Sequence, residues 1–181
     1  MIIKFWNQFR YLSADLGRWK WTSFKDIFYN IFEQGIWVTV LYRLSRALFV
    51  LNIPILKIFL RLIGFIIFKF SETCLGVAIR PSTEIGPGLY IGHIGLIRFH
   101  PDVKAGKNLS VGPGTILGER GMGKKGAPIL GDNVYIGVGA KLLGGIKIGN
   151  NVKIGANAVV LEDVPDNSTV VGIPARVMEK R

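Results

Sequence analysis

Residues 130–160 read LGDNVYIGVGAKLLGGIKIGNNVKIGANAVV, and an aliphatic residue stands at every sixth position of this stretch. The same spacing occurs upstream, between residues 79 and 109. The aliphatic positions are Ile79, Ile85, Ile91, Ile97, Val103, Leu109, Leu130, Ile136, Leu142, Ile148, Ile154 and Val160. A glycine often follows the aliphatic residue, which suits tight turns. Because six residues are too few for a helical hairpin, the repeat predicts a solenoid of short parallel strands around a narrow aliphatic core.

The repeat is interrupted between Thr115, where the next step would fall, and Leu130. This gap of fifteen residues equals two hexapeptides plus three residues, so a loop must leave the solenoid, and we place it at residues 118–128. The loop contains the glycine-rich, basic sequence GERGMGKKG. No strand-to-helix phosphate-binding pattern surrounds it, so a plain surface loop and a functional arm both remain open.

The composition changes near residue 72. All four tryptophans precede this point, whereas only three of the 23 glycines do. Apolar residues dominate from Phe24 to Phe70, and Pro54 divides them into two predicted helices, at residues 24–50 and 55–70. The sequence therefore predicts an α+β protein, with N-terminal apolar helices in residues 1–72 and a parallel β-helix with one protruding loop in residues 73–181.

The longest uncharged stretches of the helical part, residues 47–56 and 62–68, are far shorter than the ~20 apolar residues that span a bilayer. Lys57, Arg61 and Lys69 share one side of the second predicted helix and leave a broad apolar surface. That surface suits a membrane interface, or packing against the protein or a second subunit. No secretory signal is recognised at the N-terminus.

The whole chain carries 23 Lys+Arg against 12 Asp+Glu, a net charge of +11. This charge favours polyanions, phosphorylated small molecules or a membrane surface as partners. One cysteine and two histidines are too few for an internal disulfide or a His/Cys zinc site, so we expect no metal.

The segment from Gly76 to Arg181 resembles the hexapeptide-repeat acetyltransferases, in their serine acetyltransferase branch, and most closely the enzymes of colanic acid and exopolysaccharide biosynthesis. The matching stretches are 85–88 leading to His93, 114–121, 137–141, 153–160, 164–167 and 171–177. The resemblance implies a left-handed β-helix, acetyl transfer from acetyl-CoA, and a homotrimer with active sites between chains. It implies no nucleic-acid partner.

An acetyl thioester is already activated, so the enzyme must supply a base for the acceptor hydroxyl and a means of positioning it. By resemblance, His93 is the catalytic histidine that acts as general base. His100 falls on another step of the coil, where we expect a surface or acceptor-site residue. Asp102, Glu119 or a backbone carbonyl could orient His93, from the same chain or another subunit.

The resemblance also implies the donor site. Four residues of the repeat would line the pantetheine arm of CoA: Gly118, Val138, Ala140 and Ala156. Arg176 would contact the phosphates, with Lys153 and either Lys180 or Arg181 as further cations. Lys153 fits equally well as a solvated lysine on a face of the prism.

Three positions depart from serine acetyltransferases, which carry an aspartate, a second carboxylate and a second histidine where this chain has Ala78, Gly92 and Ala127. These losses predict a sugar hydroxyl as acceptor, on a saccharide or lipid-linked glycan of bacterial cell-surface polysaccharide synthesis. The enzyme would then work in the cytoplasm, peripherally at the inner membrane. The alternatives are a serine O-acetyltransferase of cysteine biosynthesis and a non-catalytic membrane-associated scaffold.

Overall fold

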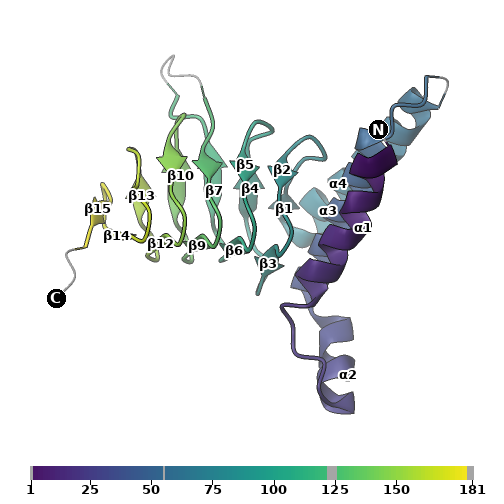
Figure 1. Cartoon of the computed structure of the whole chain (residues 1–181), viewed down its shortest axis with the longest axis horizontal. Coiled ribbons are helices and arrows are strands. Elements are labelled where there is room, and N and C mark those ends of the chain that lie inside the picture. The colour runs from purple at the N-terminus through teal and green to yellow at the C-terminus, as the bar shows by residue number, and fades with distance from the viewer. Residues whose placement is uncertain (1, 55, 122–125, 179–181) are drawn as a thin grey trace.

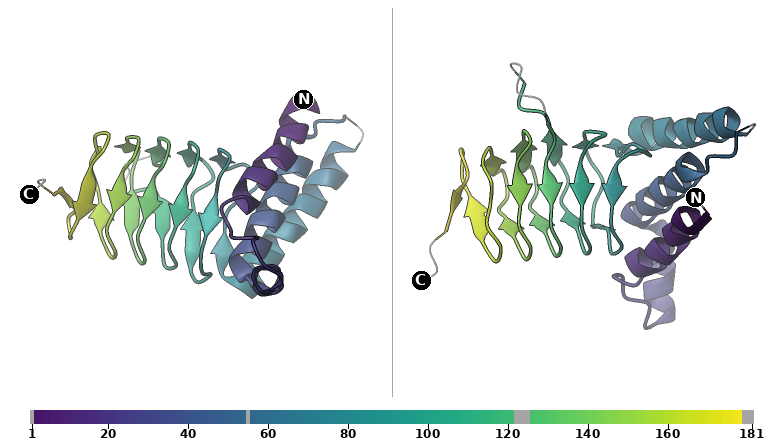
Figure 2. Two further views of the ribbon diagram at one scale, coloured as in Figure 1. Left: turned by 60° about the horizontal axis from the view of Figure 1, so that its bottom comes forward. Right: turned by 45° about the horizontal axis from the view of Figure 1, so that its top comes forward.

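Figure 1 shows the computed structural model of the chain, which describes residues 2–54, 56–121 and 126–178. The described helices come first in the chain and lie together at one end of a long three-sided prism of strands (Figures 1 and 2). They are α1 (Ile2–Leu16), α2 (Phe24–Phe32), α3 (Gln34–Val50) and α4 (Lys57–Leu75). Strand β15, the last described strand, lies at the opposite end of the prism.

The prism has three sheets, and successive strands visit them in turn. Sheet A contains β1 (Val77–Ala78), β4 (Ile97–Phe99), β7 (Ile116–Gly118), β10 (Lys141–Leu143) and β13 (Val159–Val160). Sheet B contains β2 (Glu84–Ile85), β5 (Lys104–Ala105), β8 (Ile129–Leu130) and β11 (Lys147–Ile148). Sheet C contains β3 (Tyr90–Ile91), β6 (Ser110–Val111), β9 (Tyr135–Ile136), β12 (Lys153–Ile154), β14 (Thr169–Val171) and β15 (Arg176–Val177). The described strands pair in parallel except β15, which is antiparallel to β14. This arrangement is consistent with a left-handed β-helix.

The hexapeptide spacing predicts the core correctly. Each of the twelve aliphatic side chains that share the six-residue spacing is buried, with no more than 4% of its surface exposed. Thr115 continues the same spacing and is also buried; its hydroxyl donates a hydrogen bond to the carbonyl of Gly112 at 2.7 Å. The chain leaves the prism between β7 and β8, where the spacing is interrupted, and residues 122–125 of that loop lie outside the described residues.

Asparagines stack along the edge of the prism between sheets B and C. Asn108, Asn133, Asn151 and Asn167 all have φ angles between +56° and +59°, which asparagine tolerates better than most residues. The side-chain amide of each of the first three donates to the next asparagine's carbonyl oxygen at 2.9 Å. This ladder aligns successive coils, so the edge remains regular over the length of the prism.

The helix expected at residues 24–50 is divided into α2 and α3, the helix expected at 55–70 corresponds to α4, and α1 is an additional helix. Glu33 has extended backbone angles and separates α2 from α3, while Ser23 and Asp26 form a capping box that begins α2. Helix α1 was not predicted because its buried residues are the polar Gln8 and Asp15, so it has no buried apolar stripe to detect. Helix α4 continues to Leu75.

The sequence predicts apolar helices, and this prediction is not supported, because the helices also bury charged residues. A buried ion pair lies between them and the prism. The Nε of Arg43 on α3 lies 2.7 Å from Oδ2 of Asp15 on α1, and both side chains are almost fully buried. Arg43 donates further hydrogen bonds to the carbonyls of Ile85 and Gly86, and Asp15 accepts the backbone N–H of Gly88. The first coil is therefore held by charged groups of the helices. None of the described helices has the length and hydropathy needed to cross a membrane.

Candidate active site

His93 lies in the turn from β3 to β4, at the edge of the prism where sheets C and A meet. Its side chain is exposed and borders a cavity of about 250 Å³, the His93 pocket. Tyr90, Gly92, Ser110, Pro113, Tyr135 and Val138 also line this cavity. Among the residues that the structure describes, none forms a hydrogen bond with the imidazole ring. The ring is therefore available to a ligand.

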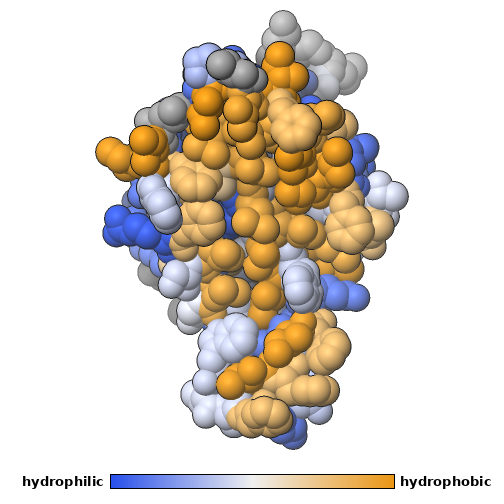
Figure 3. All heavy atoms as spheres, turned by 90° about the vertical axis from the view of Figure 1, so that its right-hand side faces the viewer, coloured by the Kyte–Doolittle hydropathy of each residue, from blue (hydrophilic) through white to orange (hydrophobic). Residues whose placement is uncertain are grey.

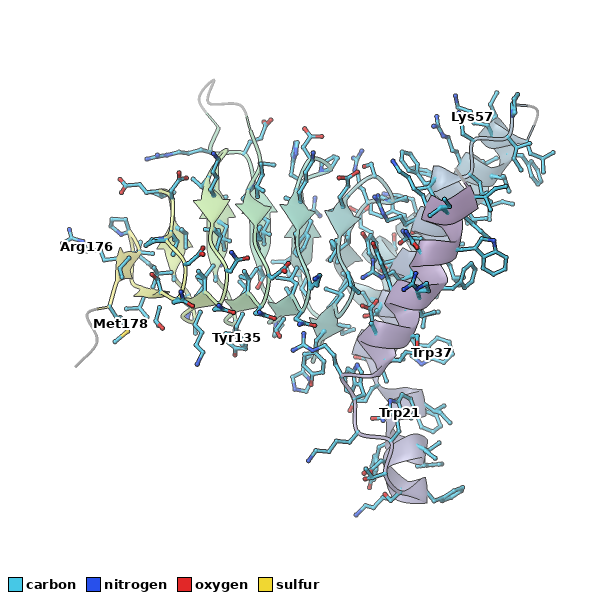
Figure 4. All side chains as sticks on the ribbon, in the orientation of Figure 1. Trp21, Trp37, Lys57, Tyr135, Arg176 and Met178 are labelled. Atoms are coloured by element: carbon cyan, nitrogen blue, oxygen red, sulfur yellow. The ribbon has the colours of Figure 1, made fainter. Side chains whose placement is uncertain are left out.

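The outer face of sheet C continues the His93 pocket toward the C-terminal end. Strand register places Tyr90, Ser110, Tyr135 and Lys153 side by side in one row. Arg176 follows on β15, paired with Val171 of β14, and is exposed. Figure 4 shows Tyr135 pointing away from the prism, and Arg176 pointing outward at the end far from the helices. Two cations therefore lie at the far end of a strip that begins at His93.

Residues with short side chains occupy the edge between sheets C and A, beside this strip. Val138 and Ala156 occupy it in successive coils and are both exposed. Gly137 has no room for a side chain, because a Cβ there would meet the backbone nitrogen of Ala156 at 2.7 Å. Backbone bonds join the coils, as from the N–H of Asn157 to the carbonyl of Val138 at 2.8 Å. The edge thus offers a smooth, shallow path for an extended ligand.

Two other residues expected at the donor site, Ala140 and Gly118, do not lie on this strip in the folded chain. The side chain of Ala140 is fully buried in the core, and its backbone carbonyl accepts the N–H of Ile116. Gly118 ends β7 at the opposite edge of sheet A, with open space around it. Neither residue contributes to the His93 pocket of the same chain. Val138 and Ala140 lie in the turn between β9 and β10, on either side of Gly139, whose φ of 73° turns the backbone between them.

A second cavity, the sheet-A pocket, has a volume of about 220 Å³. Glu72, Arg80 and Arg98 give it both signs of charge, and His100 also lines it. Glu72 accepts a hydrogen bond from Lys69 at 2.7 Å and lies 3.7 Å from Arg98. This hydrogen bond, with the attraction of the neighbouring cations, lowers the pKa of the Glu72 carboxyl, so it is a carboxylate at neutral pH.

His100 has acidic neighbours in this second pocket. Its Nδ1 accepts the backbone N–H of Asp102 at 3.3 Å and lies 3.7 Å from the Asp102 carboxylate, while Nε2 lies 3.8 Å from Glu119. Within one chain, the two carboxylates considered as partners for His93 therefore lie beside His100 instead. The described residues contain no cluster of three or more potential metal ligands.

The three positions that depart from serine acetyltransferases do not meet in one place. Ala78 lines the sheet-A pocket, Gly92 lines the His93 pocket, and the side chain of Ala127 is buried in the core. The three replaced positions therefore do not form a single acceptor site within one chain.

The segment after α1 contributes residues beside the His93 pocket that no sequence pattern predicts. Arg18 donates hydrogen bonds to the carbonyl of Gly88 at 2.8 Å and to the hydroxyl of Ser110 at 2.9 Å. Its guanidinium lies over the ring of Tyr90, which also contacts Trp19. Burial lowers the pKa of Arg18 below its ordinary value. No local pattern links residue 18 to a strand seventy residues later, so only the fold reveals this contact.

Comparison with known proteins defines the class first. Residues 127–162 match the bacterial transferase hexapeptide family, described by six repeats. Together with the three parallel sheets, this match assigns the chain the hexapeptide-repeat transferase fold.

The similar proteins are serine acetyltransferases. The enzyme of Staphylococcus aureus is 43% identical over 113 residues, which are 62% of this chain and 53% of the relative. The chain thus spans about half the length of the curated relatives it matches. The crystal structure of Neisseria gonorrhoeae serine acetyltransferase in complex with serine matches 93% of this chain and 68% of that chain, with TM-score 0.77 and 28% identity. A Brucella abortus serine acetyltransferase in complex with coenzyme A matches 95% and 66%, with TM-score 0.78 and 26% identity.

These findings overturn the sugar acceptor expected from the sequence. The relatives and structural neighbours are serine acetyltransferases, and they do not single out the colanic acid branch. The structural match covers 93% of this chain, so it includes helical residues as well as the repeat. The error has a physical cause: three lost side chains do not reveal which charges the folded chain brings in from elsewhere, and the sheet-A pocket contains Glu72 and Arg98.

Proposed function

We propose that the protein transfers the acetyl group of acetyl-CoA to the hydroxyl of serine. The observation that carries this proposal is the likeness of nearly the whole chain to serine acetyltransferases, one of them in complex with serine. The Brucella abortus enzyme in complex with coenzyme A supports the same donor class.

His93 is the general base in this proposal. A ring nitrogen takes the proton of the serine hydroxyl, and the hydroxyl oxygen attacks the thioester carbonyl. The carbon–sulfur bond then breaks, and the departing CoA thiolate recovers the proton from the imidazolium. The exposed ring of His93 supports this role, because a base must reach the hydroxyl directly.

Acetyl-CoA would lie along the strip from the His93 pocket toward the C-terminal end. Val138 and Ala156 line the path of the pantetheine arm, and Lys153 and Arg176 meet the phosphates. All four are exposed along this side of the prism, which supports the assignment. Lys180 and Arg181, the further cations expected from the sequence, lie outside the described residues.

Serine is a zwitterion, and the sheet-A pocket suits both of its charges. The Glu72 carboxylate would accept the ammonium, and Arg98 the carboxylate. This pocket lies across sheet A from His93 of the same chain. The histidine and the pocket that act together would therefore come from different chains of the trimer that the resemblance implies. We therefore propose that the His93 edge of one chain faces the sheet-A pocket of the next, and that Gly118 joins the site from that neighbour.

Incubation of the purified protein with acetyl-CoA and serine tests the proposal, with O-acetylserine measured by mass spectrometry and free CoA by thiol release. We expect stoichiometric formation of both products, and formation at least about a hundredfold slower with His93→Asn. Threonine, glucose and a nucleotide sugar serve as alternative acceptors under the same conditions. Turnover of one of these without serine turnover would assign a different acceptor. If acetyl-CoA is not consumed with serine or with any alternative acceptor, the proposal that the protein is an acetyltransferase is wrong.

A further inference from the structure

The helices expose a large apolar surface at the end of the molecule. Figure 3 looks onto this end and shows hydrophobic side chains over most of it, with hydrophilic ones mainly at its margins. We call this surface the helical end face, and we define it by Ile3 and Trp6 of α1, Phe24 and Phe28 of α2, and Ile58 and Phe59 of α4. Each of these side chains is at least half exposed, and Phe24 and Ile58 exceed 80%. Contiguous apolar surface of this kind usually marks an interaction site.

The charge around the face favours an anionic partner. Residues 1–75 contain ten Lys+Arg and only four Asp+Glu, a net charge of +6. Some of these charges do not act at the face: Arg18, Arg43 and Arg46 bond to groups of the prism, Arg43 also pairs with Asp15, and Lys69 pairs with Glu72. Six cations and two carboxylates remain, so the net charge of the helical part is still positive. Pairing this face with a second copy of itself would bring together two surfaces of the same positive sign, whereas anionic lipid headgroups would attract each of them.

Two further exposed aromatic side chains at the helical end, Trp21 and Trp37, are already hydrogen-bonded through their indole nitrogens. The indole N–H of Trp21 donates to the carbonyl of Leu16, and that of Trp37 to the carbonyl of Ile31, each at 2.8 Å. Because both N–H groups are already bonded within the protein, these rings can leave water without losing a hydrogen bond. Aromatic and basic residues together are typical of surfaces that lie in a membrane interface.

We propose that the helical end face binds the surface of an anionic bilayer, with its apolar side chains among the acyl chains near the headgroups. No described helix qualifies as a span, so the contact is peripheral. The strip leading to Arg176 runs away from the helices, so it remains in water when the face is bound. A cyclic oligomer whose axis is parallel to the prism would present every copy of the face in the same direction, which strengthens binding by multivalency. The negatively charged cytoplasmic leaflet is the membrane surface we assign.

Vesicle flotation of the full-length protein tests this proposal without reference to its activity. One set of vesicles is phosphatidylcholine alone, and the other contains equal parts of phosphatidylcholine and phosphatidylglycerol. We expect the protein to float with the anionic vesicles and to remain below the neutral ones, with less flotation at high salt. The variant Phe24→Asp/Ile58→Asp should lower the partition into anionic vesicles by about tenfold or more.

Ile129→Asp is the matched control, because it also replaces an exposed apolar residue with an aspartate. It lies on sheet B between Lys104 and Lys147, which tolerate the new charge, so flotation should match the wild type. Absence of wild-type flotation on anionic vesicles overturns the proposal, whatever the variants do. If in addition light scattering shows that Phe24→Asp/Ile58→Asp halves the molecular mass, the face joins two copies of the chain instead.

Discussion

At the scale of single residues, the two histidines of the chain have different surroundings. His93 is exposed, without a hydrogen bond to the ring from the described residues, whereas His100 lies between Asp102 and Glu119. Both of its ring nitrogens already face acidic or backbone partners, so His100 is poorly placed to take a proton from an acceptor. It is better suited to shape the sheet-A pocket.

We expect His93→Asn to lower kcat about 10²- to 10⁴-fold, the usual contribution of a positioned base. His100→Asn should instead raise the KM for serine and change kcat little, since it alters binding rather than proton transfer. Steady-state kinetics with both substrates varied distinguish the two outcomes. A full-strength kcat in His93→Asn, or the reverse pattern between the two histidines, would contradict these assignments.

Arg176 is the cation best placed for the phosphates of CoA. We expect Arg176→Ala to weaken the binding of CoA by about tenfold, and that of dephospho-CoA by less, because the arginine would pair with the ribose 3′-phosphate. Isothermal titration with both ligands measures this difference. Lys147→Ala removes an exposed cation from sheet B and should leave both affinities unchanged. Equal losses for the two ligands in Arg176→Ala would place the arginine at another group.

At the scale of elements, the helices and the first coil are joined by polar contacts. Asp15 and Arg43 come from α1 and α3, and between them they bond to backbone groups of the turn that leads from β2 to β3. A buried charge whose partner is removed keeps its desolvation cost, so such pairs are sensitive to single changes.

We therefore expect Arg43→Met to reduce the free energy of unfolding by about 3–5 kcal/mol, since it leaves the Asp15 carboxylate buried without its cation. Urea denaturation followed by circular dichroism measures the loss. Asp15→Asn/Arg43→Met should be less destabilised than the sum of the two single variants, because the two side chains interact directly. Additive losses would mean that the ion pair itself contributes little.

At the scale of the whole molecule, the His93 pocket lies at the edge between sheets C and A, and the sheet-A pocket lies on sheet A beside α4. The proposed trimer makes them one site by placing different chains side by side. Two inactive variants should then restore each other: His93→Ala supplies an intact sheet-A pocket, and Glu72→Gln/Arg98→Ala supplies an intact histidine. Co-expression in equal amounts should return about a quarter of the wild-type activity, because each site needs one intact half from each of two neighbours.

Each variant expressed alone is the control for this experiment and should be nearly inactive. Tandem affinity tags on the two variants allow the mixed trimers to be purified before the assay, and these should have about a third of the wild-type activity, because each contains one intact site out of three. If purified mixed oligomers remain inactive, the base and the acceptor pocket do not come from different chains, and the acceptor must bind beside His93 within one chain.

The hexapeptide positions were predictable because they depend on local periodicity. An aliphatic residue every six positions can be buried only by a narrow prism, so Ile79 and Val160 follow the same rule despite the eighty residues between them. The loop after β7 was predictable for the same reason, as it interrupts that rule. His93 could be singled out by the motif around it, and its exposure in a turn agrees with the role proposed for it.

What only the tertiary structure decided involves residues that are distant in the sequence. Arg18 reaches Ser110, and Glu72 of α4 faces Arg98 of β4. Local patterns carry no information on such pairs, because the repeat determines how each coil is built and not what packs against it. Charge and shape at the pockets depend on which elements meet, and that is a property of the folded chain.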